Sequence, residues 1–246
     1  MNKFSKVAAA AALAVAAAGA NAAFVIDDFS TSQALVRDGT TGDGGVGFTS
    51  VCGGGIIGGC RDIYVEKFGA AVDDDTPGFP GLGVSAFVNA GRLAYSQDTG
   101  QRGIGIVRWD GANNFAGITV DGLGGIDLTS GNVVGVRFQV LSADLNFPFT
   151  LQAWTDPTNT NTWVMSEVTV NASAGPGNYD VFFGGFAGAD FSRVGALQLV
   201  LNNGLINDID IQIDIIQNIP EPGTLALVGA TLLGLGAARR RAAKKA

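Results

Sequence analysis

The sequence predicts an all-β fold, an antiparallel β-sandwich of the jelly-roll type, for residues 23–217. Three observations support this prediction. Apolar and polar residues alternate along short segments, which is the period of a half-buried strand. Glycine makes up 37 of the 246 residues and, together with Asp and Asn, separates these segments as turn residues do. No part of this region shows a sustained helical period, and a hydrophobic content of 47% is enough to form a core.

The candidate strands follow one another along the whole region. In its first half they are 23–27, 34–37, 61–68, 84–88, 92–96 and 103–109. In its second half they are 134–140, 149–154, 163–170, 197–201 and 208–215. About ten short antiparallel strands with glycine-rich turns are typical of a sandwich built from two packed sheets.

The N-terminal residues 1–22 have the pattern of a secretory signal peptide. Lys3 and Lys6 precede an apolar, alanine-rich segment at 7–18. Residues 20–22, Ala-Asn-Ala, then supply the small side chains that a signal peptidase requires. We therefore expect cleavage after this tripeptide and export of the chain that follows it.

The C-terminal residues 218–246 contain three parts in a fixed order. A Pro-Glu-Pro tripeptide precedes an apolar segment at 224–238, and a basic tail at 239–246 ends the chain. As a helix the apolar segment is about 22 Å long, which is short for a hydrocarbon core of about 30 Å. It predicts a single, short transmembrane helix whose basic end lies in the cytoplasm. The residues that define the tripeptide and the start of the tail are Pro220, Glu221, Pro222, Arg239, Arg240 and Arg241.

This order of elements resembles the PEP-CTERM sorting signal of exported proteins in Gram-negative bacteria that make exopolysaccharide. The resemblance implies that exosortase, a membrane enzyme, recognises the tripeptide and cleaves near it. The protein would then be anchored in the inner membrane transiently and end at the cell surface or outside the cell. The two prolines keep the tripeptide extended and accessible to such an enzyme. An ordinary single-span tail with an incidental Pro-Glu-Pro linker remains the alternative.

The composition excludes several functions for the central domain. Residues 23–222 contain 22 acidic and 8 basic side chains, and 19 of the acidic ones are Asp. The resulting net charge of −14 repels nucleic acid, which is therefore not an expected partner. The chain has no histidine, so Ser-His-Asp and Cys-His catalysis and His-ligated zinc are excluded. No nucleophile elbow, phosphate loop or metalloprotease helix is present, and we expect a protein that is not an enzyme.

The two cysteines predict a disulfide bond. Cys52 and Cys60 enclose seven residues, five of them glycine, and an exported chain meets an oxidising environment. Closing so short a loop would stabilise the domain by about 2–3 kcal/mol. A metal site is the alternative, but it would need two further soft ligands, which the sequence does not contain.

The ends of the central region are similar to those of galactose-binding-like jelly rolls, a fold that many carbohydrate-binding modules share. The similarity rests on the apolar, Asp-bearing start 24–29 and on the segments 191–194, 197–199 and 210–216 near the end of the region. It implies that the first and last strands are neighbours and hold a structural calcium ion. The ligands implied by the resemblance are Asp27, Asp28 and Asp214. The alternative is that these residues are solvent-facing positions of half-buried strands.

The three tryptophans are candidates for a sugar-binding surface. Alternation predicts that Trp109, Trp154 and Trp163 all face outward. The inward-facing neighbours behind this prediction are Ile104 and Ile106, Leu151 and Ala153, and Val164, Val168 and Val170. Exposed indole rings stack on the apolar faces of sugars. Alternation fails at strand ends and bulges, however, so buried or edge-covering tryptophans remain the alternative.

These observations predict a non-catalytic exported protein of the cell surface, extracellular matrix or biofilm, processed by signal peptidase and exosortase. A polysaccharide-binding, lectin-like module that contacts exopolysaccharide is the alternative function. A secreted glycan-active enzyme is the third class; it would need two positioned carboxylates, and a chain this rich in Asp places some pair together by chance.

Overall fold

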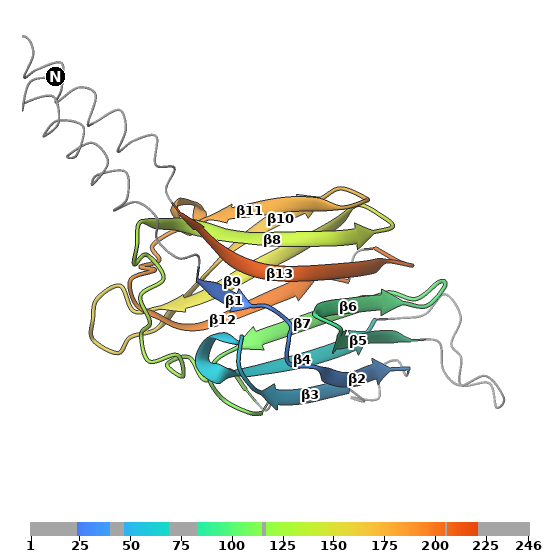
Figure 1. Ribbon diagram of the computed structural model, residues 1–246, viewed down its shortest axis with the longest axis horizontal. Helices are drawn as coiled ribbons and strands as arrows, with labels where there is room; N and C mark the ends of the chain where they lie inside the picture. Colours follow the sequence, from blue (N-terminus) through green and yellow to red (C-terminus); the bar gives the residue numbers. More distant parts are fainter. Residues whose placement is uncertain (1–23, 40–46, 69–82, 115–116, 205, 221–246) are drawn as a thin grey trace, which may run out of the picture. The chain divides into compact units, whose positions relative to one another are not determined.

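The described part of the chain forms two packed antiparallel sheets. The computed structural model describes residues 24–39, 47–68, 83–114, 117–204 and 206–220. Thirteen strands and two short 3-10 turns, η1(Ile57–Gly59) and η2(Phe183–Gly185), lie within these residues. The strands form a β-sandwich, which confirms the predicted fold class (Figure 1). No helix in the described ranges is long and apolar enough to cross a membrane. The predicted signal peptide and transmembrane segment lie outside those ranges.

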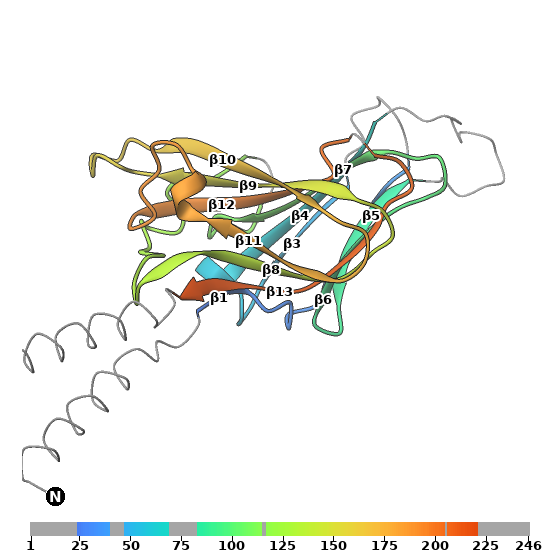
Figure 2. The ribbon, with the colours of Figure 1, turned by 90° about the horizontal axis from the view of Figure 1, so that it is seen from above.

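One sheet has seven strands. Its order is β11(Gly177–Phe182), β8(Val133–Ala143), β13(Asp210–Pro220), β6(Arg92–Gln97), β5(Val84–Asn89) and β2(Gln33–Asp38), with the short β1(Val25–Asp27) pairing to β13. The last strand of the chain is therefore central in this sheet. Figure 2 shows the two sheets from above, one over the other.

The other sheet has six strands. Its order is β10(Val164–Ala172), β9(Phe147–Thr155), β12(Val194–Leu201), β7(Gly103–Trp109), β4(Cys60–Lys67) and β3(Gly47–Cys52). The sequence pattern did not predict β3 or β11. Both are six residues long and begin with glycine, so neither carries enough alternating apolar residues to be recognised.

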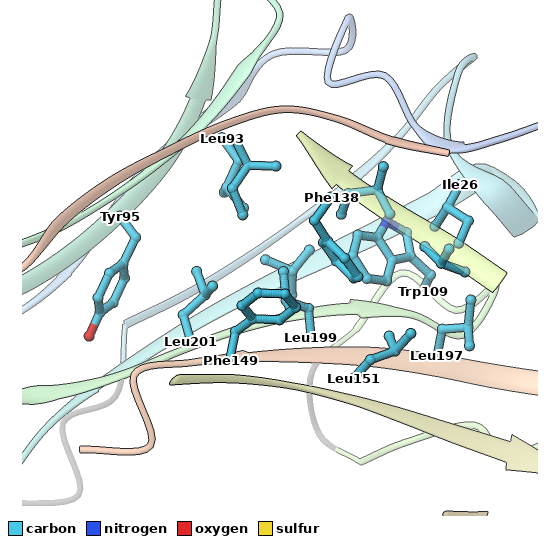
Figure 3. Packing of buried hydrophobic residues seen from close by; sticks show 14 of the residues in the cluster. Ile26, Leu93, Tyr95, Trp109, Phe138, Phe149, Leu151, Leu197, Leu199 and Leu201 are labelled. Atoms are coloured by element: carbon cyan, nitrogen blue, oxygen red, sulfur yellow. The ribbon is translucent and has the colours of Figure 1, made fainter. Parts of the chain in front are cut away.

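Alternate residues of both sheets meet in one core. Leu93 and Tyr95 extend from β6, while the six-stranded sheet contributes Phe149, Leu151 and Leu199 from the opposite side (Figure 3). All five side chains are buried. The period-two prediction was therefore correct for β6, β9 and β12.

The prediction that Trp109 faces outward was wrong. Its side chain is fully buried, whereas Ile104 and Ile106, which were expected to face inward, are half-buried on the other side of β7. The inward positions before Trp109 include Gly105, where a Cβ atom would lie 2.6 Å from the ring of Tyr95. Glycine makes room for this ring and thereby removes the apolar signal from the inward face of the strand.

The first and last strands are neighbours, as the jelly-roll resemblance implied. In the β1–β13 ladder Val25 pairs with Gln217, and the backbone N–H of Asn218 donates to the carbonyl oxygen of Phe24 at 3.0 Å. Strand β13 ends at Pro220, so the sheet includes the first three residues of the predicted sorting segment. The alternation of the predicted strand 208–215 would bury Ile215 together with Ile211 and Ile213. Instead, Ile216 is fully buried and Ile215 is half-buried, so the alternation changes phase at the end of this strand.

The predicted disulfide is present. Cys52 and Cys60 face each other in the β3–β4 ladder and are bonded, with 4.0 Å between their Cα atoms. The glycine-rich loop that they close contains η1, and its Ile56 and Ile57 side chains are buried in the core. The loop is therefore an ordered cover at one end of the sandwich.

Candidate functional site

A row of polar side chains crosses the outer face of the six-stranded sheet. Each strand contributes one residue, and the register places them opposite one another from β10 to β3. Their order is Glu167, Gln152, Gln198, Arg108, Asp62 and Ser50. Four members of the row have core residues as neighbours along their own strands. Examples of these neighbours are Ala153, Leu197 and Ile63. Because side chains alternate along a strand, the polar row faces away from the core.

Hydrogen bonds join four members of this row. Arg108 Nε donates to Gln198 Oε1 at 2.9 Å, and Gln198 Nε2 donates to Gln152 Oε1 at 2.7 Å. Gln152 Nε2 then donates to Glu167 Oε2 at 2.8 Å. Arg108 and Gln198 are each 8% exposed, Gln152 is half-buried and Glu167 is exposed. The chain of bonds fixes the amide orientations and leaves one N–H of each glutamine for a further partner.

Apolar side chains border the polar row on both sides. On one side Phe48, Tyr64 and Ile106 lie opposite one another across β3, β4 and β7, and Phe48 is 60% exposed. On the other side Trp154 of β9 lies opposite Met165 of β10. The outward orientation predicted for Trp154 is therefore correct, and its ring is half-buried. A polar strip between apolar borders matches a ligand that has both apolar faces and hydroxyl groups.

The carboxylate of Asp62, next to last in the row, is buried. Its side chain is fully buried, and neither oxygen accepts a hydrogen bond of ordinary geometry. Burial raises the pKa of Asp62, and the negative charge of Asp110 adds to this effect. The neighbouring Ser50 hydroxyl and the Arg108 charge lower the pKa in part. Asp62 is thus a buried acceptor within the row, and its two oxygens have no hydrogen-bond partner of ordinary geometry.

The other two tryptophans do not lie in this row. The ring of Trp163 lies against Gly195 of β12, where a Cβ atom would be 2.5 Å from the ring, and near Gly125. It is half-buried. Trp109 lies in the core and its Nε1 donates to Asp27 Oδ2 at 2.7 Å, so it is not available to a sugar.

The structure does not support Asp27 as a calcium ligand. Arg61 Nη1 donates to both oxygens of Asp27, at 2.8 and 2.9 Å, and the backbone N–H of Phe29 donates to Oδ1. The carboxylate is thus neutralised by a guanidinium within the core. Asp28 accepts instead from the backbone of Ser30, and no group of three or more potential ligands among the described residues is placed to hold a metal. The calcium site implied for Asp27, Asp28 and Asp214 is therefore not formed by these residues.

Sequence reasoning found one residue of this face, Trp154, and missed the polar row. Glutamine is common on any exposed strand, and nothing in the sequence shows that Gln152 and Gln198 are opposite each other. The sequence does carry a partial signal: each of the strands β7, β9 and β12 has one charged or amide residue, and core residues flank it on both sides. Only the strand order, which the sequence does not contain, brings them into line.

The predicted sorting residues lie almost entirely outside the described part of the chain. Pro220 is exposed at the end of β13, whereas Glu221, Pro222 and the arginines at 239–241 are not described.

A comparison with protein families identifies the C-terminal segment. Residues 218–241 match the family model described as the PEP-CTERM protein-sorting motif. This match agrees with the resemblance drawn from the tripeptide, the apolar segment and the arginine cluster. It implies sorting through the exosortase pathway, with export and transient anchoring through the C-terminus. A comparison with curated proteins finds no match to the chain.

Solved structures with distant similarity include carbohydrate-binding modules. A family 30 module is 11% identical with a TM-score of 0.40, and the alignment covers 83% of this chain and 91% of that one. A family 11 module of a Clostridium thermocellum cellulosomal cellulase is 11% identical with a TM-score of 0.39, over 82% of this chain and 98% of that one. Similarities this distant do not transfer a ligand to this chain.

Proposed function

We propose that this chain is a non-catalytic exported protein that binds polysaccharide on the outer face of its six-stranded sheet after sorting through the exosortase pathway. The observation that carries the binding proposal is the hydrogen-bonded row from Arg108 to Glu167 between two apolar borders. The sorting motif at 218–241 supports the export route. The cell surface or extracellular matrix of an exopolysaccharide-producing bacterium is the proposed destination.

The chemistry of the face suits sugars. Hydroxyl groups both donate and accept hydrogen bonds, and the side-chain amides of Gln152 and Gln198 do the same. The half-buried rings of Trp154 and Tyr64 offer apolar surfaces on which sugar rings stack. Residues 23–222 carry a charge of −14, which opposes polyanions at low ionic strength. A neutral polysaccharide is therefore the proposed ligand.

The proposed processing divides the chain into three parts. Signal peptidase removes 1–22, the sandwich of 23–217 is the exported domain, and 218–246 is the sorting segment with its membrane helix at 224–238. The extension of β13 to Pro220 supports a cut on the C-terminal side of this residue, because the strand is central in its sheet. Signal peptidase, exosortase and the inner membrane are the partners of this route.

Polysaccharide binding can be tested with one matched set of variants. The processed protein is run by affinity electrophoresis through gels that contain neutral polysaccharides, and Gln198→Ala and Gln152→Ala are compared with Gln139→Ala. Gln139 is a half-buried residue of β8 in the other sheet. Loss of one hydrogen bond is worth about 1 kcal/mol, so each row variant should bind about fivefold more weakly.

The control should bind as the wild type does. An absence of retardation by every neutral polysaccharide would contradict the binding proposal, as would an equal loss in the Gln139 control. The first result would favour a purely structural surface protein.

A further inference from the structure

The two long sides of the sandwich are built differently. On one side β2 and β3 approach so closely that a Cβ atom on Gly47 would lie 2.7 Å from the carbonyl oxygen of Arg37. On the opposite side the last strands are β10 and β11, which follow each other in the chain (Figure 1). The edge strands β2 and β3 are therefore in backbone contact with each other, and β10, like the other edge strands, has a ladder partner on one side only.

Strand β10 lacks the features that normally block an edge. Its nine residues pair with β9 from Val164 to Ala172 without a register shift, so no bulge bends it away. It contains no proline, lysine or arginine, and Glu167 is its only charge. Val164 and Met165 are 46% and 45% exposed. A long, regular and partly apolar edge strand presents unpaired backbone groups to any further strand.

We propose that β10 is a self-association site, at which the β10 strand of a second copy adds in antiparallel orientation. With a two-fold axis through Val168, the two β10 strands pair along their edges without opposing charges. This axis places Glu167 opposite Thr169 of the second copy, and Met165 opposite Asn171, so no two charges face each other. Odd-numbered residues then pair with odd-numbered residues, and even-numbered with even-numbered. The side chains on the outer face of one copy therefore continue the outer face of the other, in one continuous sheet.

The association of two copies should be weak, for two reasons. One added strand buries much less surface than the roughly 1,600 Å² of a standard interface. The charge of −14 on residues 23–222 of each copy also opposes the approach of two copies. Added salt screens this repulsion, so association should strengthen between low and moderate ionic strength. The polar rows of the two copies would lie on the same face, but self-association does not require the proposed glycan binding.

Charge substitutions at one position test the register directly. Thr169 is exposed on β10, and Thr169→Asp places a carboxylate opposite Glu167 of the second copy, twice per dimer. Thr169→Lys places an ammonium group there instead. Sedimentation equilibrium of the processed protein should show dimers whose dissociation constant rises at least fivefold with Asp and falls at least twofold with Lys.

Matched variants on the neighbouring edge provide the control. Asn178 of β11 is exposed in the other sheet, and Asn178→Asp and Asn178→Lys make the same changes in net charge. These variants should shift the dissociation constant by much less than the β10 variants do. Melting temperatures verify that all four variants fold. A protein that stays monomeric at millimolar concentration and moderate salt, or equal effects at positions 169 and 178, would overturn the proposal.

Discussion

Replacement of Arg61 by methionine should destabilise the domain more than any single surface substitution. Arg61 of β4 is fully buried, and besides its two bonds to Asp27 it donates to Gln33 Oε1 and to the carbonyl oxygen of Thr31, both at 2.6 Å. Its guanidinium carbon also lies 5.3 Å from the centre of the Phe29 ring. Because Asp27 belongs to β1 and Arg61 to β4, the pair connects the two sheets.

The magnitude follows from what the substitution leaves behind. Methionine fills most of the volume but leaves the Asp27 carboxylate buried without its cation. Breaking a buried pair in this way costs about 3–5 kcal/mol. In a domain of this size 1 kcal/mol shifts the melting temperature by about 2–4 °C, so melting should fall by about 6–20 °C. Urea unfolding followed by tryptophan fluorescence measures the loss, since Trp109 itself donates to Asp27.

A second arginine provides the matched control. Arg137 Nε and Nη2 donate to the two oxygens of Asp180 at 2.7 and 2.8 Å, but these side chains are 38% and 27% exposed. Arg137→Met should therefore cost at most about 1 kcal/mol. The double variant Asp27→Asn, Arg61→Met should recover part of the loss, because it removes the isolated charge. An Arg61→Met protein as stable as Arg137→Met would refute this account of the core.

Three further predictions follow from the same structure. Reduction of the Cys52–Cys60 bond should lower the free energy of unfolding by about 2–3 kcal/mol, and urea curves of a Cys52→Ser, Cys60→Ser protein should not respond to reductant. The pKa of Asp62 is raised in the folded protein, so ionisation of this carboxyl group costs stability. This cost appears as the pH rises above 3.8, the ordinary pKa of the group. Asp62→Asn should therefore melt at a higher temperature than the wild type at pH 8, and the difference should disappear below pH 3.8; a constant difference would contradict the assignment. Finally, the mass of the exported protein should lack the basic tail only in hosts that contain exosortase, and an identical C-terminus with and without the enzyme would contradict the sorting route.

The sequence was sufficient for most of the fold because alternation is a local property. Strands such as β8 and β9 carry clear apolar periods and were found close to their true limits. The alternation failed where glycine replaces an apolar side chain, as at Gly105, since the space is filled by Tyr95 from the other sheet. Because Gly105 has no apolar side chain, the inward face of β7 could not be recognised, and Trp109 was assigned to the wrong face.

The site was much less accessible to sequence reasoning than the fold. The buried role of Asp27 depends on Arg61, which is 34 residues away in the chain and in the other sheet. No local pattern distinguishes such an ion-paired aspartate from a calcium ligand. The polar row has the same origin, because Gln152 and Gln198 meet only when β9 and β12 become neighbours. The disulfide was predictable because its two residues are close in sequence and need no strand order.

Binding of neutral polysaccharide to the outer face of the six-stranded sheet can be tested by an NMR titration with soluble oligosaccharides that follows backbone and side-chain signals. Chemical shifts should change at the side-chain amides of Gln152 and Gln198 and at the indole N–H of Trp154. The buried Trp109 and the amide of Gln139 on the other sheet should stay unchanged. Saturable changes confined to the seven-stranded sheet, or no change with any neutral oligosaccharide, would contradict the claim.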